Sequence, residues 1–198
     1  MPVPDDRGPR WRARHAEIVD TAARLFARRG YTATGVADLC EATGLGRGAL
    51  YYYIESKEHL LAQIHDRVMG DVLEGARAIQ ALEEPAPTRL RLLGAELIDV
   101  ITRYPDHVWV FLHEWKALTG DLAKVFHELR REYEDVVRTI MEDGVRDGAF
   151  VISDVRLTVL AWLGMHNYTY QWFRPGGELE PSQIADGYDE LFLRGIQA

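Results

Sequence analysis

The residues of this chain best suited to bind nucleic acid are an arginine and three tyrosines in one short segment. Arg47 and the consecutive Tyr51, Tyr52 and Tyr53 fall within seven residues. A guanidinium group and phenol hydroxyls donate hydrogen bonds to phosphate oxygens and to base edges. Three consecutive tyrosines cover too much of a helix circumference to be buried together. The cluster therefore indicates a nucleic-acid-binding surface. The alternative is that these tyrosines are core aromatics of an ordinary helix.

Two short helices joined by a glycine-containing turn are expected to position this cluster. The first spans about 34–43, with Thr34 as its N-cap, and the second spans about 47–54. Gly44 lies at the turn, where a left-handed backbone conformation costs little only for glycine. A longer helix over about 11–29 precedes them. The pattern predicts a helix-turn-helix motif.

The rest of the chain also shows helical periodicity, with apolar residues recurring every three or four positions. Ser56 is expected to cap a long helix, Ser153 to cap the helix that holds 157–173, and Pro181 to open the last one. No alternating strand pattern competes. We predict an all-α fold of about nine helices. The helix-turn-helix pattern lies in the N-terminal part, residues 1–57, and a longer helical part follows over 58–198.

The charge distribution supports a basic N-terminal domain on an acidic body. The 198 residues carry a net charge of -8, yet residues 1–57 hold nine Lys and Arg against seven Asp and Glu. This part is +2 and the remainder is -10. A basic N-terminal domain favours contact with a polyanion, although solvated charges scattered at random are the alternative. The arginines of the N-terminal arm are candidates for the minor groove, unless the arm is a disordered tail; they are Arg7, Arg10, Arg12 and Arg14.

Several kinds of site are not expected. A lone cysteine, Cys40, forms no internal disulfide and fits a reducing compartment, so we expect a cytoplasmic protein. The histidines lack metal-ligand spacing, and no metal or cofactor is predicted. The longest uncharged stretch, 157–173, is too short and too polar to span a bilayer. The alternatives to a regulator are an all-α enzyme and a DNA-independent interaction protein with a vestigial helix-turn-helix.

The segment from Ile18 to Leu61 resembles the TetR family of transcriptional regulators. The matching residues are Ala23-Arg24-Leu25-Phe26, Arg29-Gly30-Tyr31, Thr34, Gly44, Leu50-Tyr51-Tyr52-Tyr53 and Ser56-Lys57-Glu58. The resemblance implies an N-terminal arm and three-helix DNA-binding domain over 1–57 and a ligand-binding and dimerisation domain over 58–198. It further implies a dimeric repressor that binds a palindromic double-stranded operator and is released by a small-molecule effector. It also implies that Thr34, Arg47, Tyr51, Tyr52 and Lys57 face DNA, with Lys57 near a phosphate.

The stretch 157–173 is apolar or aromatic nearly all round, so it is expected to be buried on more than one face. We predict that this helix and the last one, 181–196, pair with their symmetry mates in a homodimer. The alternative is a single, deeply buried core helix. The residues predicted for the dimer interface are Trp162, Tyr170, Trp172, Tyr188 and Phe192.

The middle helices carry many large side chains with polar tips, which is typical of a small-molecule chamber, although most could be ordinary core residues. The candidates are Trp109, His113, Trp115, His127, Met141, Met165, His166, Tyr168, Gln171 and Arg174. The segment 172–177 is also similar to TetR-type regulators of lipid and steroid catabolism that respond to CoA thioesters. That similarity would place Arg174 and Gln171 near an acyl-CoA or lipid ligand. The alternative is a plain turn in which Arg174 caps helix carbonyls.

Overall fold

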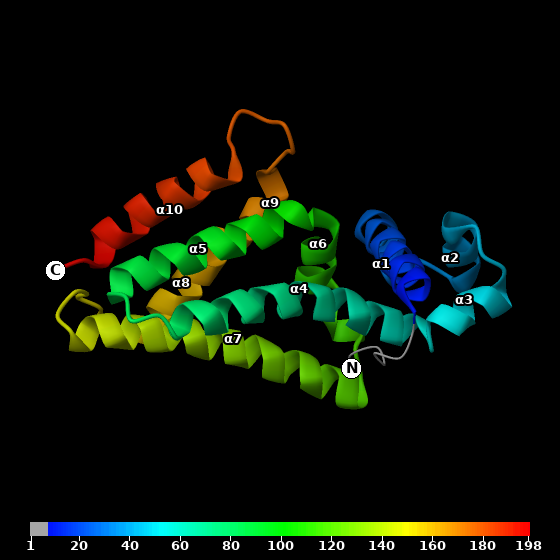
Figure 1. The fold of residues 1–198 in the computed structure, drawn as a ribbon, viewed down its shortest axis with the longest axis horizontal. Coiled ribbons are helices and arrows are strands. Elements are labelled where there is room, and N and C mark those ends of the chain that lie inside the picture. Colours follow the sequence, from blue (N-terminus) through cyan, green and yellow to red (C-terminus); the bar gives the residue numbers. More distant parts are fainter. Residues whose placement is uncertain (1–7) are drawn as a thin grey trace. The chain divides into compact units, whose positions relative to one another are not determined.

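The computed structural model describes residues 8–198, and in this range the chain is built from helices joined by short connections (Figure 1). The prediction of an all-α fold is confirmed. The helices are α1 (Pro9–Arg29), α2 (Val36–Thr43), α3 (Arg47–Tyr53), α4 (Lys57–Gln80), α5 (Ala86–Arg103), α6 (Pro105–His113), the 3-10 turn η1 (Trp115–Ala117), α7 (Gly120–Arg146), α8 (Val155–Asn167), α9 (Thr169–Trp172) and α10 (Pro181–Ile196).

The chain divides into two compact units. One comprises the chain up to Val68 together with Asp106–His127, and the other comprises Met69–Pro105 with Glu128–Ala198. The long helices α4 and α7 each contribute to both units. None of the helices in residues 8–198 is long and apolar enough to cross a membrane.

The first unit places α1, α2 and α3 around a shared apolar core. Phe26 of α1, Leu39 of α2 and Leu50 of α3 are fully buried there, together with Leu61 of α4. Each of these helices is short or amphipathic, so burial of its apolar side against the others stabilises it more than helix propensity does. The segment 106–127 packs onto the same core through Val110 and other apolar residues.

The second unit is organised around α5. Helix α10 packs along α5, and α8 and α9 pack against α5 as well. The end of the chain is fixed by a bridge between Phe150 and Gln197, which follow α7 and α10 respectively. A partly buried ion pair between Arg89 and Asp143 (2.8 Å) joins the start of α5 to α7.

Three helix ends differ from the sequence-based expectation. Thr34 does not cap α2. Gly35 is the N-cap instead, and its N–H donates to Asp38 Oδ2 (2.7 Å). Asp154, and not Ser153, caps α8 by accepting from the N–H of Leu157 (3.0 Å). A carboxylate is a stronger acceptor than a hydroxyl and is favoured at a helix N-terminus. The stretch 157–173 is also divided at Tyr168 into α8 and α9.

Two buried polar side chains of the second unit, His166 and Asp189, lie close to Gly94 of α5. A Cβ atom at Gly94 would lie 2.9 Å from His166 Nε2 and 3.1 Å from Asp189 Oδ1, so glycine is required for this close approach. The Nδ1–H of His166 donates to the Trp162 carbonyl (2.8 Å), which leaves its buried Nε2 without a hydrogen-bond partner. Burial lowers the pKa of His166 to about 4 and raises the pKa of Asp189 to about 7. Both side chains are therefore favoured in their neutral forms.

We expect Asp189→Asn to stabilise the protein increasingly as the pH rises from about 4 to about 7. Folding raises the Asp189 pKa from its ordinary 3.8 to about 7, so the folded state binds this proton more tightly. The resulting stabilisation is complete below about pH 4 and is lost as the pH rises through about 7. Asparagine stays neutral throughout. The lowered pKa of His166 makes its own contribution to stability rise with pH. Both the wild type and the variant contain His166, so this contribution cancels when the two are compared.

Thermal unfolding of the wild type and the variant across this pH range measures the difference. The matched control is Glu190→Gln, which neutralises an exposed acid on the same helix that does not contribute to the raised pKa of Asp189. Its effect on the melting temperature should not grow with pH in this way. A difference between Asp189→Asn and wild type that stays constant from about pH 4 to about pH 8 would show that Asp189 is ionised in the folded protein.

Candidate nucleic-acid interface

Helix α3 presents one face to solvent and anchors the other. Gly44 adopts the left-handed conformation expected of it (φ 68°), and its N–H donates to the Glu41 carbonyl (3.3 Å), which ends α2. Leu50 is fully buried and fixes α3 to the core, whereas Tyr51 and Tyr52 are 40% and 65% exposed. The solvent-facing tyrosines are what a DNA-reading helix requires.

Arg47 lies at the exposed start of the same helix. Its guanidinium group is 6.0 Å from the centre of the Tyr51 ring. A planar cation beside an aromatic ring is held in a restricted range of orientations, yet its N–H donors stay available. Arg47, Tyr51 and Tyr52 therefore form a continuous exposed donor surface on α3, which we call the reading surface.

Tyr53 belongs to the anchoring side of α3 and not to the reading surface. It is half-buried, and its ring stacks on Trp11 of α1 with centroids 5.6 Å apart. Trp11 also stacks on His15 (4.7 Å). The prediction that all three tyrosines face DNA is corrected here, because positions 51, 52 and 53 point in directions about 100° apart on the helix. The local sequence around Trp11 does not reveal this role, because its partner Tyr53 lies 42 residues along the chain.

The prediction that Thr34 faces DNA is wrong for its side chain. Thr34 is fully buried, and its Oγ1 hydroxyl donates to the Gly30 carbonyl (2.8 Å). This bond closes the loop between α1 and α2. Its C-terminal neighbour Gly35 is exposed and caps α2. The hydroxyl therefore has a structural role in shaping the loop.

Lys57 also has partners other than the predicted phosphate. Its ammonium group donates to the carbonyls of Tyr31 (2.9 Å) and Thr34 (2.8 Å) and lies 4.1 Å from the centre of the Tyr31 ring. On the other side of the loop, the Tyr31 N–H donates to Glu114 Oε1 (3.0 Å). Two charged side chains, one from α4 and one from the segment after α6, thus hold the 30–34 loop that leads into α2.

We expect Lys57→Ala to weaken operator binding without changing its salt dependence. The lysine holds the loop that positions α2 and α3, and charge-assisted hydrogen bonds of this kind contribute about 1.5–3 kcal/mol each. A phosphate contact would instead lower the slope of log K against log salt by about 0.9. Fluorescence anisotropy titrations at several salt concentrations measure both quantities. A reduced slope would identify Lys57 as a phosphate ligand, and Lys57→Arg serves as the charge-preserving control.

The basic residues near the N-terminus lie on a helix. Arg10 and Arg12 are exposed in the first turns of α1, which begins at Pro9, so these two do not form a free arm; Arg7 lies outside the described residues. Arg14 is hydrogen-bonded within the first unit. It donates to the Thr43 carbonyl (2.7 Å) at the end of α2, where a cation is favoured by the helix dipole.

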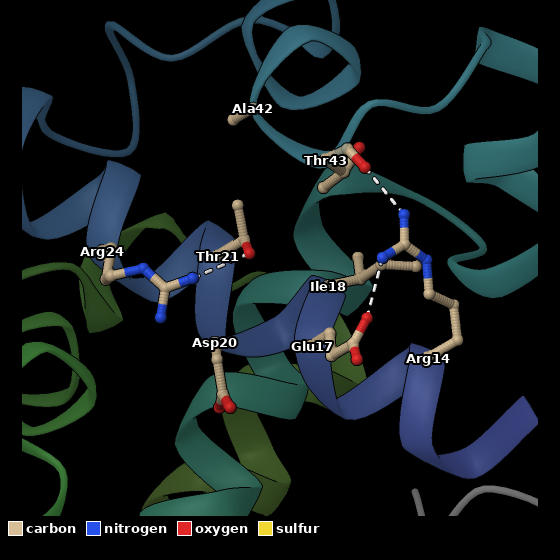
Figure 2. A pocket seen from close by; sticks show the side chains of 8 residues that line it. All are labelled: Arg14, Glu17, Ile18, Asp20, Thr21, Arg24, Ala42 and Thr43. Carbon is tan, nitrogen blue, oxygen red and sulfur yellow. Dashed lines mark hydrogen bonds and ion pairs between the residues drawn. The ribbon is translucent and has the colours of Figure 1, made fainter. Parts of the chain in front are cut away.

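A pocket of about 350 Å³ lies along α1 and the end of α2 (Figure 2). The residues that line it are Arg14, Glu17, Ile18, Asp20, Thr21, Arg24, Ala42 and Thr43. Arg14 donates to Glu17 Oε2 (2.7 Å) and Arg24 donates to Thr21 Oγ1 (2.9 Å). Both guanidinium groups are therefore hydrogen-bonded to other residues that line the pocket. Two arginines and two acids line this pocket, and none of the predicted ligand residues does, so it is a polar groove between helices of the first unit.

The residues predicted for the ligand chamber are distributed over both units. Trp109, His113, Trp115 and His127 belong to the first unit, where Trp109 stacks on His113 (4.3 Å) and Trp115 meets His127 edge-on (5.5 Å). The others belong to the second unit. Within residues 8–198 no group of three or more His, Cys, Asp and Glu could hold a metal ion.

In the second unit the predicted ligand residues do not share one environment. Met141 and His166 are fully buried, while Tyr168 is 64% exposed and Gln171 is also exposed. Met165 is half-buried. The remaining residue, Arg174, donates to the carbonyls of Phe173 (2.9 Å) and Gln171 (3.4 Å). This corresponds to the alternative in which the arginine caps helix carbonyls at a turn.

The predicted dimer residues include one that cannot form an interface. Trp162 is fully buried inside its own subunit, so its assignment to the interface is wrong. Tyr170, Tyr188 and Phe192 are half-buried, and Trp172 is 38% exposed. The exposed apolar residues of α8 are instead Leu157 (64%), Leu160 (49%) and, at its C-cap, Tyr168, and α10 contributes Leu191 (69%).

The exposed residues of α8 recur at helical spacing, and so do the buried Val159, Trp162 and His166. Because α8 is apolar on both faces, its periodicity predicts two apolar stripes. It does not predict which of the two stripes is buried in the core. Exposed apolar side chains on two helices that contact each other are candidates for a protein–protein interface. We define Leu157, Leu160, Tyr168 and Leu191 as the α8/α10 surface.

Comparison with known proteins matches nearly the whole chain to one group. The model of "Bacterial regulatory proteins, tetR family" matches residues 18–64, and that of "Tetracyclin repressor-like, C-terminal domain" matches residues 83–196. The HTH-type transcriptional repressor KstR2 of Rhodococcus jostii strain RHA1 is 30% identical over 98% of this chain and 97% of the relative.

Two solved structures are also similar. The TetR family regulator PfmR from Thermus thermophilus is 31% identical, with a TM-score of 0.82 over 89% of this chain and 97% of that one. The structure of AibR in complex with isovaleryl coenzyme A and operator DNA is 30% identical, with a TM-score of 0.80 over 90% of this chain and 97% of that one.

Proposed function

The chain belongs to the tetR family of bacterial regulatory proteins, and on this premise we propose that it is a dimeric repressor released from its operator by an acyl-CoA-like effector. As a member of this family it is a ligand-responsive DNA-binding transcriptional regulator. Its relatives are named transcriptional repressors and regulators, which confirms the prediction that it is not an enzyme. We place its action in the cytoplasm, where the operator is.

The observation that best supports DNA binding is the reading surface on α3. Arg47, Tyr51 and Tyr52 face solvent from a short helix whose other side is fixed by Leu50. In a two-fold dimer two such helices would enter successive major grooves about 34–36 Å apart, and the operator would be palindromic. We assign operator binding to residues 1–57, and effector binding and dimerisation to residues 58–198, with the α8/α10 surface in the dimer interface.

The effector class is inferred from one relative and from the composition of the chain. AibR, 30% identical over 90% of this chain, has been solved with isovaleryl coenzyme A and operator DNA. The aromatic and methionine residues of the helices after α3 suit an acyl group. An effector releases the operator only if it binds the DNA-free conformation more tightly, and a coupling free energy of about 1–3 kcal/mol is typical.

The experiment that tests this proposal begins with selection of bound duplexes from a random pool. Binding to the selected operator is then measured with octanoyl-CoA, isovaleryl-CoA or free coenzyme A. We expect an acyl-CoA to weaken operator binding about 5- to 150-fold and free coenzyme A to have little effect. A response to cationic drugs, with none to thioesters, would reject the effector class. Absence of any selected sequence would reject operator binding itself.

A further inference from the structure

Helix α3 is short and has few anchors in the first unit. Leu50 is buried, Tyr53 is half-buried, and the other five residues of α3 are exposed. Helices of two turns are not stable in water by themselves. The C-cap residue Ile54 is also buried, but it lies four positions after Leu50 and so on the same line along the helix. A helix held along one line rolls about that line unless a contact beside the line prevents it. In α3 the side chain placed to prevent rolling is that of Tyr53.

Tyr53 is held by a stack of rings that belongs mainly to α1. The Trp11 ring is nearly parallel to the Tyr53 ring (27°, centroids 5.6 Å apart) and to the His15 ring (14°, 4.7 Å). The Nε2–H of His15 donates to Gln63 Oε1 of α4 (3.1 Å). We call Trp11, His15 and Tyr53 the ring stack. It fastens α3 to α1 and α4 on the flank of α3 that lies opposite Tyr51.

The ring stack also touches the reading surface. The Tyr53 ring meets the Tyr52 ring edge-on, with centroids 5.1 Å apart and planes at 81°. Tyr52 is 65% exposed, and an exposed side chain loses rotational freedom when it binds a partner. A fixed aromatic neighbour restricts that freedom in advance, because edge-to-face pairs have a preferred geometry. Trp11 is therefore connected to the most exposed tyrosine of α3 through a single intervening ring.

We propose that Trp11 is a positioning residue for operator recognition. By stacking on Tyr53 it sets the rotation of α3 and the direction of Tyr52, and thereby decides which base edges the reading surface meets. The inference rests on the proposed function, in which α3 lies in a major groove. Hydrogen bonds to base edges depend on exact orientation, whereas attraction to phosphates depends on charge. Loss of Trp11 should therefore reduce sequence discrimination and leave sequence-independent binding intact.

Trp11→Leu keeps an apolar side chain and removes the stacking ring. We expect it to bind the selected operator roughly tenfold more weakly, with unchanged affinity for a random duplex and an unchanged salt slope. Trp11→Phe keeps a ring over Tyr53 and should bind within about twofold of the wild type. Tyr53→Leu removes the other half of the contact and should show the same loss. Combining it with Trp11→Leu should add nothing further, because the two rings act as a unit. Fluorescence anisotropy with both duplexes measures these affinities.

Val19→Ala is the matched control for stability. Val19 is a buried core residue of α1 outside the ring stack, so its truncation should lower the melting temperature and leave operator affinity unchanged. If Val19→Ala weakened operator binding as much as Trp11→Leu does, lost stability would explain both results and the inference would be overturned. Tyr53→Leu provides the same comparison if Trp11→Leu does not fold.

Two further outcomes would overturn the role of Trp11. One is wild-type operator affinity in Trp11→Leu, and the other is an equal loss of affinity for the operator and the random duplex. Either result leaves the proposed function intact, since the wild type still recognises its operator. A wild type that selects no operator from the random pool would reject operator binding, and the role of Trp11 with it.

Discussion

Replacing Trp162 with alanine is expected to lower the free energy of unfolding by about 3–5 kcal/mol. Its side chain is fully buried in the second unit, with its ring 4.1 Å from that of His166. Alanine would remove the buried aromatic surface and leave a cavity that the surrounding helices fill only in part. Urea denaturation at a fixed protein concentration measures the loss, and His166→Gln in the same background would show how far the two residues are coupled.

The matched control is Leu160→Ala on the exposed face of the same helix. Leu160 is 49% exposed in the subunit, so this change should alter self-association more than the stability of the subunit itself. Sedimentation velocity at several concentrations reports the association. If Trp162→Ala instead left the unfolding free energy unchanged and weakened only the dimer, the placement of Trp162 in the subunit core would be contradicted.

Replacing Arg47 with alanine is expected to weaken operator binding by about 1–3 kcal/mol, or roughly 5- to 150-fold, and to relax its sequence preference. Arg47 is exposed at the start of α3, where a bidentate contact to a guanine edge is within the chemistry of a guanidinium group. Tyr52→Phe, which removes only a hydroxyl at the most exposed tyrosine of α3, is expected to have a smaller effect in the same direction.

Competition with operators changed at single base pairs distinguishes base reading from phosphate binding. Loss of discrimination at one position in each half-site identifies the base that Arg47 reads. Arg131→Ala removes an exposed arginine of α7 in the other compact unit and serves as the charge control. Both variants should melt as the wild type does. An Arg47→Ala protein that keeps the wild-type affinity, specificity and salt slope would exclude α3 as the reading helix.

Local sequence signals located most of the helices correctly. Gly44 ends α2 in the left-handed conformation that was expected of it, and Ser56 caps α4 by accepting from the His59 N–H (3.0 Å). Pro105 and Pro181 open α6 and α10. These signals act over a single turn, and the same few residues supply both the signal and the hydrogen bonds. Helical geometry also predicts that three consecutive tyrosines cannot all be buried, and Tyr51 and Tyr52 are indeed exposed.

Contacts between distant parts of the chain decided the remaining assignments. Lys57 finds its two carbonyl partners in a loop more than 20 residues earlier, and Glu114 reaches the same loop from 83 residues away. The spacing of these residues in the sequence predicts none of the three hydrogen bonds. A short motif such as Ser56-Lys57-Glu58 indicates the position of a lysine on a helix. The tertiary structure determines which groups its ammonium group hydrogen-bonds.

The amino-acid sequence by itself determined most of the helices and the turn at Gly44, because each depends on neighbours within one or two turns of a helix. Only the tertiary structure decided which apolar stripe of α8 is core and that Thr34 is buried. It also brought the Trp11 ring of α1 onto the Tyr53 ring of α3. Burial depends on which surfaces of distant helices come together, and the periodicity of one helix does not predict that pairing.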